Sequence, residues 1–234
     1  MINHIIYTKN KILYVFIFTL FLLSSCSGQN EKVEEPELIS FRKFLVQKKI
    51  DKNLGVQNEY ETLNEEHFYS NHYFNFSTKL PKNYTLDRGN GEYTIIRGLD
   101  TLTSSTVHIG VTPISKTGNG YLKFQSSPMK YIDEVFGGNF KDVILNSFKT
   151  RTTIEVLNLD QSEHKVRTTN YVVYTVQYEE TYDSLQVPFV NVQYVTYLWG
   201  NLFTISYTTP EVLFDPKILT DVIIHTNYFE PQNE

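Results

Sequence analysis

Alanine, the residue with the highest intrinsic helix propensity, is absent from this sequence of 234 residues. Tyrosine and phenylalanine are abundant instead, with 17 and 16 residues, and aromatic side chains are enriched in strands. With 41% hydrophobic and 20% charged residues, the composition is that of a folded globular domain. The sequence therefore predicts a folded protein in which strands predominate.

Long basic runs are also absent. No run of Lys or Arg exceeds two residues, and the formal net charge is −5. Because proteins that bind nucleic acid carry clustered basic side chains, we predict no nucleic-acid partner.

The usual motifs of catalysis are missing as well. The chain has no Gly-x-Ser-x-Gly, no glycine-rich phosphate loop, no His-Glu-x-x-His and no paired-cysteine metal motif. A hydrolase of the common serine, cysteine or zinc types is therefore disfavoured. We predict a protein that is not an enzyme, with no catalytic residues, no metal and no cofactor.

The first 25 residues have the layout of a signal peptide. Two lysines, Lys9 and Lys11, precede Ile12–Leu23, twelve residues that are almost all apolar. A bilayer core about 30 Å thick needs roughly 20 helical residues, so this run is too short for a stable membrane anchor. We expect residues 1–25 to be a signal peptide that is removed.

The only cysteine lies directly after this run. Leu23-Ser24-Ser25-Cys26 resembles the lipobox of bacterial lipoproteins, with an aliphatic residue, two small residues and then cysteine. The resemblance implies cleavage before Cys26 and a diacylglycerol thioether on its sulfur, whose thiolate is a good nucleophile. The alternative is an incidental cysteine at an ordinary secretory site. A single cysteine excludes an intramolecular disulfide.

Lipid on Cys26 would fix the location of the protein. Two or three acyl chains bind a membrane much more firmly than one, whereas an acidic chain gains nothing from anionic lipid. Ser27, in place of aspartate, resembles lipoproteins that are released to the outer membrane. We therefore expect a protein of the bacterial cell envelope, held in the outer membrane through Cys26.

Residues 26–67 are predicted to be a tether that carries a short helix. Residues 27–37 are polar and acidic, which is typical of a flexible segment. The apolar residues of 38–52 then follow the spacing of an amphipathic helix. Residues 58–66 are polar again, so we expect a single domain over 68–230.

Apolar residues with a period of two predict seven strands in that domain. The expected strands lie near residues 73–80, 93–96, 107–111, 153–159, 170–178, 189–198 and 202–207. Helical spacing predicts a helical region from Ser127-Pro128 to Lys149 and a last helix from Asp215-Pro216 to about Asn227. Trp199-Gly200-Asn201 has the composition of a tight turn. This order predicts an α+β fold with a mainly antiparallel sheet of about six to seven strands flanked by helices.

The pattern resembles the bacterial PsbP-like proteins, which share the Mog1/PsbP fold. The residues that carry the resemblance are Tyr69-Ser70-Asn71, Phe74-Asn75-Phe76, Leu80-Pro81-Lys82-Asn83-Tyr84 and the segment from Tyr194 to Thr208 with its closing helix. The resemblance implies an αβα sandwich and a binding protein rather than an enzyme. It has no chemical motif, so it assigns no catalytic residue.

Two groups of polar residues could carry chemistry. The first group has side chains of the types that bind metals: Glu65, Glu66, His67 and His72. A spacing of five residues places the two histidines on different faces of a strand or a helix, so only a loop could bring them together. Glu179, Glu180 and Asp183 could be a carboxylate cluster for glycosidic chemistry. We interpret the first group as a solvated loop and the second as a polar hairpin connection.

The remaining histidines have no visible partner in the sequence. His108 alternates with Val107 and Ile109, which predicts a polar residue on the surface or towards a helix. His164 lies in a polar segment typical of a hairpin tip, and His225 lies near the end of the last helix.

Aromatic residues of the last strands are the candidates for a binding surface. Alternation sends Tyr174 and Tyr178 to one face of the sheet and Tyr171 to the other, so some of these side chains must be core. Tyr197 and Trp199 are our candidate binding residues, because a tryptophan at a turn is costly to expose.

We therefore expect a lipid-anchored envelope protein that binds a protein partner as an accessory subunit. The alternative is a lipoprotein that binds a small molecule or glycan. An enzyme without a linear motif is the third hypothesis. A partner surface should be apolar, a ligand site should be a pocket with convergent polar groups, and an active site should perturb its titratable groups.

Overall fold

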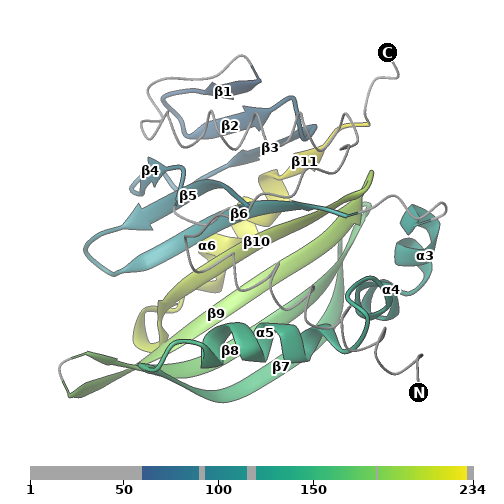
Figure 1. Cartoon of the computed structure of the whole chain (residues 1–234). Coiled ribbons are helices and arrows are strands. Elements are labelled where there is room, and N and C mark those ends of the chain that lie inside the picture. Colours follow the sequence, from purple (N-terminus) through teal and green to yellow (C-terminus); the bar gives the residue numbers. More distant parts are fainter. Residues whose placement is uncertain (1–59, 90–92, 115–119, 183, 231–234) are drawn as a thin grey trace, which may run out of the picture.

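The computed structural model describes residues 60–89, 93–114, 120–182 and 184–230 (Figure 1). They form a seven-stranded sheet and a four-stranded sheet, and every strand pair is antiparallel. The order in the large sheet is β4 (Thr85–Asp87), β5 (Thr94–Asp100), β6 (Ser105–Pro113), β10 (Asn201–Pro210), β9 (Leu185–Leu198), β8 (Thr169–Tyr182) and β7 (Ile154–Val166). The order in the small sheet is β1 (Glu61–Leu63), β2 (Phe68–Asn71), β3 (Phe76–Lys79) and β11 (Asn227–Tyr228).

Helices pack on both faces of the large sheet. The helical elements are α3 (Gly120–Ser126), α4 (Pro128–Val135), α5 (Phe140–Lys149), the short 3₁₀ helix η1 (Glu211–Leu213) and α6 (Pro216–His225). Side chains of α3, α4 and α5 share one core with β7, β8 and β9, whereas α6 and the small sheet share a second core on the opposite face. The predicted α+β fold, with a mainly antiparallel sheet flanked by helices, is confirmed.

Local signals explain where the helices begin and end. Pro128 occupies the first turn of α4, and Gly137 follows that helix with φ +69°. Asn139 accepts a hydrogen bond from the N–H of Lys141, which starts α5 as a separate helix. Asp215 caps α6 in the same way, but α6 ends at His225, two residues before the predicted end. The helix α3 was not predicted, because its sequence carries no helical apolar stripe.

The predicted tight turn joins β9 to β10. Leu198 pairs with Asn201, so the loop has two residues, Trp199 with φ +48° and Gly200 with φ +79°. Positive φ angles at both loop residues are typical of a type I′ turn, whose twist matches that of the adjoining strands.

The hairpin β7–β8 is longer than the sequence indicates. Val166 pairs with Thr169, so the hairpin tip is at 167–168, and the prediction that His164 lies at a tip is wrong. The prediction that Glu179 and Glu180 belong to a connection is also wrong, because β8 continues to Tyr182. Charged side chains on the exposed positions of these strands conceal the strand pattern from a hydropathy argument.

The small sheet begins upstream of Phe68, where the sequence placed the start of the domain. Glu61 of β1 is buried, and both of its carboxylate oxygens lie close to Arg88 Nη1, at 2.8 Å for Oε1 and 2.6 Å for Oε2. Tyr69 donates to Oε1 at 2.5 Å, and Asn71 donates to it at 3.3 Å. A buried ion pair therefore holds β1 in a segment whose composition is that of a loop.

Several predictions fall outside the described residues. They are the signal peptide, Cys26, and residues 26–59 of the tether with its helix at 38–52. Among the residues that are described, no helix is long and apolar enough to cross a membrane.

Candidate functional site

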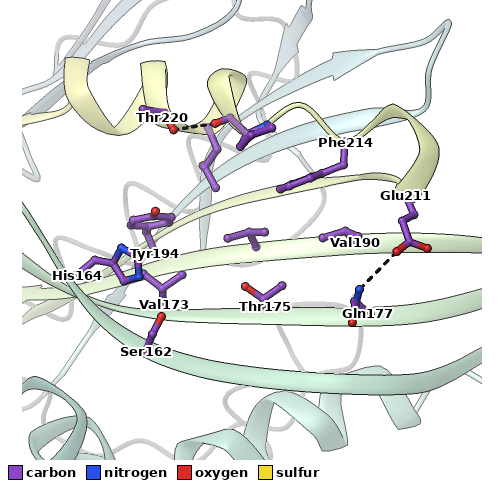
Figure 2. A pocket seen from close by; sticks show the side chains of 13 residues that line it. Ser162, His164, Val173, Thr175, Gln177, Val190, Tyr194, Glu211, Phe214 and Thr220 are labelled. Carbon is purple, nitrogen blue, oxygen red and sulfur yellow. Dashed lines mark hydrogen bonds between the residues drawn. The ribbon is translucent and has the colours of Figure 1, made fainter.

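A groove follows one face of the large sheet, between its outer strands and the segment that carries η1 and α6 (Figure 2). Its volume of about 440 Å³ is in the range of small-molecule sites. Strands β7, β8 and β9 form the floor, and the wall comes from η1, α6 and the residues between them. The lining residues are Ser162, His164, Val173, Thr175, Gln177, Val190, Val192, Tyr194, Glu211, Phe214, Pro216, Leu219 and Thr220.

Strand alternation selects the side chains of the floor. On β8, Val173, Thr175 and Gln177 face the groove, whereas Tyr174 and Val176 face the core under the helices. Thr175 pairs with Val192 of β9. The floor therefore changes from apolar on β9 to polar on β7, where Ser162 and His164 lie.

Polar contacts mark the two ends of the groove. At one end, Gln177 Nε2 donates to Glu211 Oε1 at 3.4 Å, which links the floor to η1. At the other end, the rings of His164 and Tyr194 meet in a T-shaped arrangement with centroids 6.0 Å apart. Figure 2 shows Thr175 and Val173 on the floor between these two contacts.

The chemistry of the lining favours an uncharged ligand. None of the lining residues is a lysine or an arginine, and the carboxylate of Glu211 already accepts from Gln177. Burial raises the pKa of Tyr194, so its phenol stays neutral. The other polar groups are hydroxyls, an amide and an imidazole, which hydrogen-bond neutral groups.

Three connections leave the same end of the large sheet (Figure 1), and exposed apolar side chains lie in or directly beside each of them. Leu102 lies between β5 and β6 and is 95% exposed, Leu185 follows the β8–β9 turn at 65%, and Val212 of η1 is 83% exposed. Thr106 pairs with Thr208 and Phe189 with Pro210, so the three connections leave the same end of the sheet. We call Leu102, Tyr182, Leu185, Val212 and Leu213 the apolar end.

His108 lies in a row of polar residues that crosses the sheet on the face opposite the groove. It pairs with Arg97 on one side and with Ser206 on the other, and Ser206 pairs with Gln193. Its half-buried place on β6 agrees with the predicted polar position. Arg97 also binds Asp87 through two hydrogen bonds.

The predicted acidic and histidine groups do not form a shared site. His67 Nδ1 lies 2.9 Å from the carbonyl of Pro81, and Glu66 lies 4.0 Å from Lys79. Glu180 is buried and binds Arg151 at 2.6 Å. Within the described parts of the chain, no three His, Cys, Asp or Glu side chains are placed to hold a metal ion together.

The two predicted binding aromatics lie apart from the groove. Tyr197 is 3% exposed, and its ring packs against Tyr131 with centroids 4.9 Å apart, so it presents no surface to a partner. Trp199 is half-buried at the β9–β10 turn, where it packs against the core shared with α6. The predicted division of the other tyrosines is confirmed, with Tyr174 and Tyr178 under the helices and Tyr171 on the opposite face.

The sequence argument did not identify the groove. His164 lines it from a strand rather than a hairpin tip, and Glu211 and Phe214 come from a connection without a motif. The alternation of Val173, Thr175 and Gln177 was the one available signal, because it places two polar side chains on the same strand face as a valine.

No protein-family model and no curated protein matches this chain. A crystal structure from Bacteroides thetaiotaomicron is similar at 11% identity and a TM-score of 0.40, over 69% of this chain and 47% of that chain, so the match spans about half of that protein. The cyanobacterial PsbP of Synechocystis is similar at 14% identity and a TM-score of 0.43, over 75% and 96% of the two chains. LpqN of Mycobacterium tuberculosis, described as involved in cell envelope biogenesis, is similar at 7% identity and a TM-score of 0.40, over 65% and 82%. These distant likenesses are compatible with the α+β fold, which rests on the strand pairing of this chain itself.

Proposed function

We propose that this protein is a lipid-anchored accessory protein of the bacterial cell envelope that acts by binding a protein partner rather than by catalysis. The lipobox-like segment that ends at Cys26 supports the anchor, and Ser27 favours the outer membrane. The lipid would attach the amino terminus, and 33 further residues, 27–59, separate Cys26 from the first described residue. This length would let the domain reach a partner away from its attachment point.

The apolar end is the observation that carries the protein-binding proposal. Leu102 and Val212 lie in two connections, Leu185 begins β9 directly after a third, and all three connections leave the same end of the large sheet. A protein partner bound at this end of the sheet would remove these exposed apolar side chains from water. Burial of each such side chain by a partner would contribute about 1.5–3 kcal/mol.

Cross-linking of the intact lipoprotein in its native membrane tests the proposal. We expect one dominant cross-linked protein. Its yield should fall at least about tenfold in Leu185→Asp and in Leu102→Asp, which corresponds to a loss of roughly 1.4 kcal/mol in the free energy of binding. The matched control is Leu122→Asp, because Leu122 of α3 is 66% exposed but lies outside the apolar end. An unchanged cross-linking pattern in both apolar-end variants would refute this use of the surface.

The anchor has a separate test. We expect Cys26→Ser to remove labelled lipid from the protein and to leave it uncleaved or released from the membrane fraction. Unchanged fractionation with no labelled lipid in the unaltered protein would contradict lipidation at Cys26.

The groove supports binding of a small ligand as a second function. It has the volume of a ligand site, with an apolar wall and polar groups that converge on its floor.

A further inference from the structure

We propose that the groove between β7–β9 and the η1–α6 segment binds uncharged sugar units of a glycan. This site is separate from the apolar end, so the proposal does not depend on a protein partner. Four properties of the groove lead to it: the apolar wall, the polar floor, the lack of a cationic side chain and the pairing of the floor strands.

The apolar wall suits the C–H face of a sugar ring. The wall contributes Phe214 and Leu219, Val190 and Val192 of β9 add apolar surface to the floor, and the ring of Tyr194 lies at one end of that floor (Figure 2). A sugar presents carbon-bound hydrogens on the faces of its ring and hydroxyl groups at its edge. A site that recognises it therefore needs apolar contact on one side and hydrogen-bonding groups on the other.

The polar floor argues against an acyl chain. Thr175 lies on β8, the middle strand of the floor, and Ser162 lines the groove from β7, where it pairs with Val173. A hydrocarbon chain over these side chains would remove water from their hydroxyl groups without replacing the hydrogen bonds to that water, which costs free energy. The hydroxyl groups of a sugar would replace them.

The lining also argues against an anionic ligand and against a peptide. It has no lysine or arginine, the side chains that recognise phosphate and carboxylate groups. Strands β8 and β9 are paired on both sides, so within the groove their backbone offers no free edge to an extended peptide; the free edge of the sheet belongs to β7, at the rim of the floor. Hydrogen bonds from β8 and β9 to a ligand in the groove must therefore come from their side chains.

Binding can be measured on the full-length lipoprotein in phosphatidylcholine nanodiscs, applied to an array of neutral, sulfated, phosphorylated and sialylated glycans. We expect uncharged glycans to bind, with an affinity that is unchanged between about 0.05 and 0.5 M salt, because salt screens only charged interactions. Saturation-transfer NMR with a neutral glycan that binds should give its strongest signals from ring C–H protons.

Isosteric variants locate the site. Thr175→Val removes one hydroxyl without changing the shape of the floor, so we expect it to weaken glycan binding about 2- to 12-fold. Thr204→Val is the matched control, because Thr204 is also a half-buried threonine of the large sheet. Its neighbours Phe203 and Ile205 face the core shared with α6, so strand alternation places Thr204 on the face opposite the groove. Near-ultraviolet circular dichroism of both variants verifies that they fold like the unaltered protein.

Three results would overturn the proposal. The first is an array on which no uncharged glycan binds. The second is equal binding by Thr175→Val and the unaltered protein. The third is displacement of the glycan by decanol together with tighter decanol binding in Thr175→Val, which would assign the groove to an acyl chain. None of these results bears on cross-linking at the apolar end, so the two functions are tested independently.

Discussion

The buried pair between Glu61 and Arg88 gives the sharpest test of how the small sheet is held. The side chains of Arg88 and Glu61 are 3% and 2% exposed, and Arg88 Nη1 lies within 2.8 Å of both carboxylate oxygens. Removing one partner of such a pair leaves a buried charge without compensation, which costs about 3–5 kcal/mol. We therefore expect Glu61→Gln to lower the free energy of unfolding by that amount.

The loss of unfolding free energy corresponds to a lower melting temperature, Tm, by an amount that depends on the size of the domain. For a domain of 150–250 residues, each kcal/mol lowers Tm by about 2–4 °C, so we expect a decrease of about 6 to 20 °C. Burial raises the pKa of Tyr69, and the neighbouring charge of Glu61 raises it further. The hydroxyl of Tyr69 is therefore a neutral donor at the pH of an ordinary unfolding experiment. Its hydrogen bond to residue 61 can survive in Glu61→Gln, and the loss then reports the ion pair itself.

Thermal and urea unfolding, followed by the fluorescence of Trp199, measure the effect. Trp199 packs against the core that includes Tyr69, so its signal follows the unfolding of this part of the molecule. The matched control is Glu66→Gln, because Glu66 lies 4.0 Å from Lys79 at the surface and should contribute less than about 1 kcal/mol. The double variant Glu61→Leu/Arg88→Met should recover only part of the loss, because it removes both buried charges but leaves the hydroxyl of Tyr69 without its acceptor. A cost below about 1 kcal/mol for Glu61→Gln would refute the reasoning.

Three further predictions concern single residues. Burial alone would raise the pKa of Asp87, but hydrogen bonds from Arg97 and from the N–H of Gly89 hold this pKa below its usual value. The stabilisation from Asp87 is thus present above the pKa of about 3.9 that this group has in the unfolded chain, and it is lost as pH falls through the lowered pKa of the folded state. In the unaltered protein, the free energy of unfolding should therefore fall between about pH 5 and 2, and in Asp87→Asn this fall should be smaller. Gly200→Ala should cost roughly 1–2 kcal/mol in urea unfolding because φ is +79° there, whereas Gly138→Ala should be nearly neutral because an added Cβ would meet nothing within 4 Å. Ile144→Ala should cost about 2–5 kcal/mol by the same assay, because Ile144 is fully buried between α5 and the sheet.

The parts of the fold that the sequence predicts are those with a strong local signal. Pro128 and Asp215 start helices where expected, and the alternation around Val107, Ile109 and Val111 gives β6. The parts it misses depend on contacts far apart in the chain. Glu61 belongs to a strand only because Arg88, 27 residues away, neutralises its charge in the core.

The same limit explains why the groove was not predicted. Its floor combines Ser162, Thr175 and Val192, which come together only through the register of β7, β8 and β9. Its wall comes from η1 and α6, whose position over the floor no local pattern encodes. A sequence argument can predict that Thr175 faces the same side as Val173, but it cannot place Phe214 across from them.

The 3₁₀ helix η1 lies between the two proposed sites and decides how they can be tested. Its first residue, Glu211, faces the groove and accepts from Gln177, whereas Val212 and Leu213 contribute to the apolar end. A substitution in η1 could therefore alter both surfaces at once. Leu102 lies in the β5–β6 connection, Leu185 begins β9, and Thr175 lies inside the groove on β8, so variants at these residues separate partner binding from glycan binding. If both ligands bind and each shifts η1, thermodynamic linkage requires each to change the affinity of the other by the same factor.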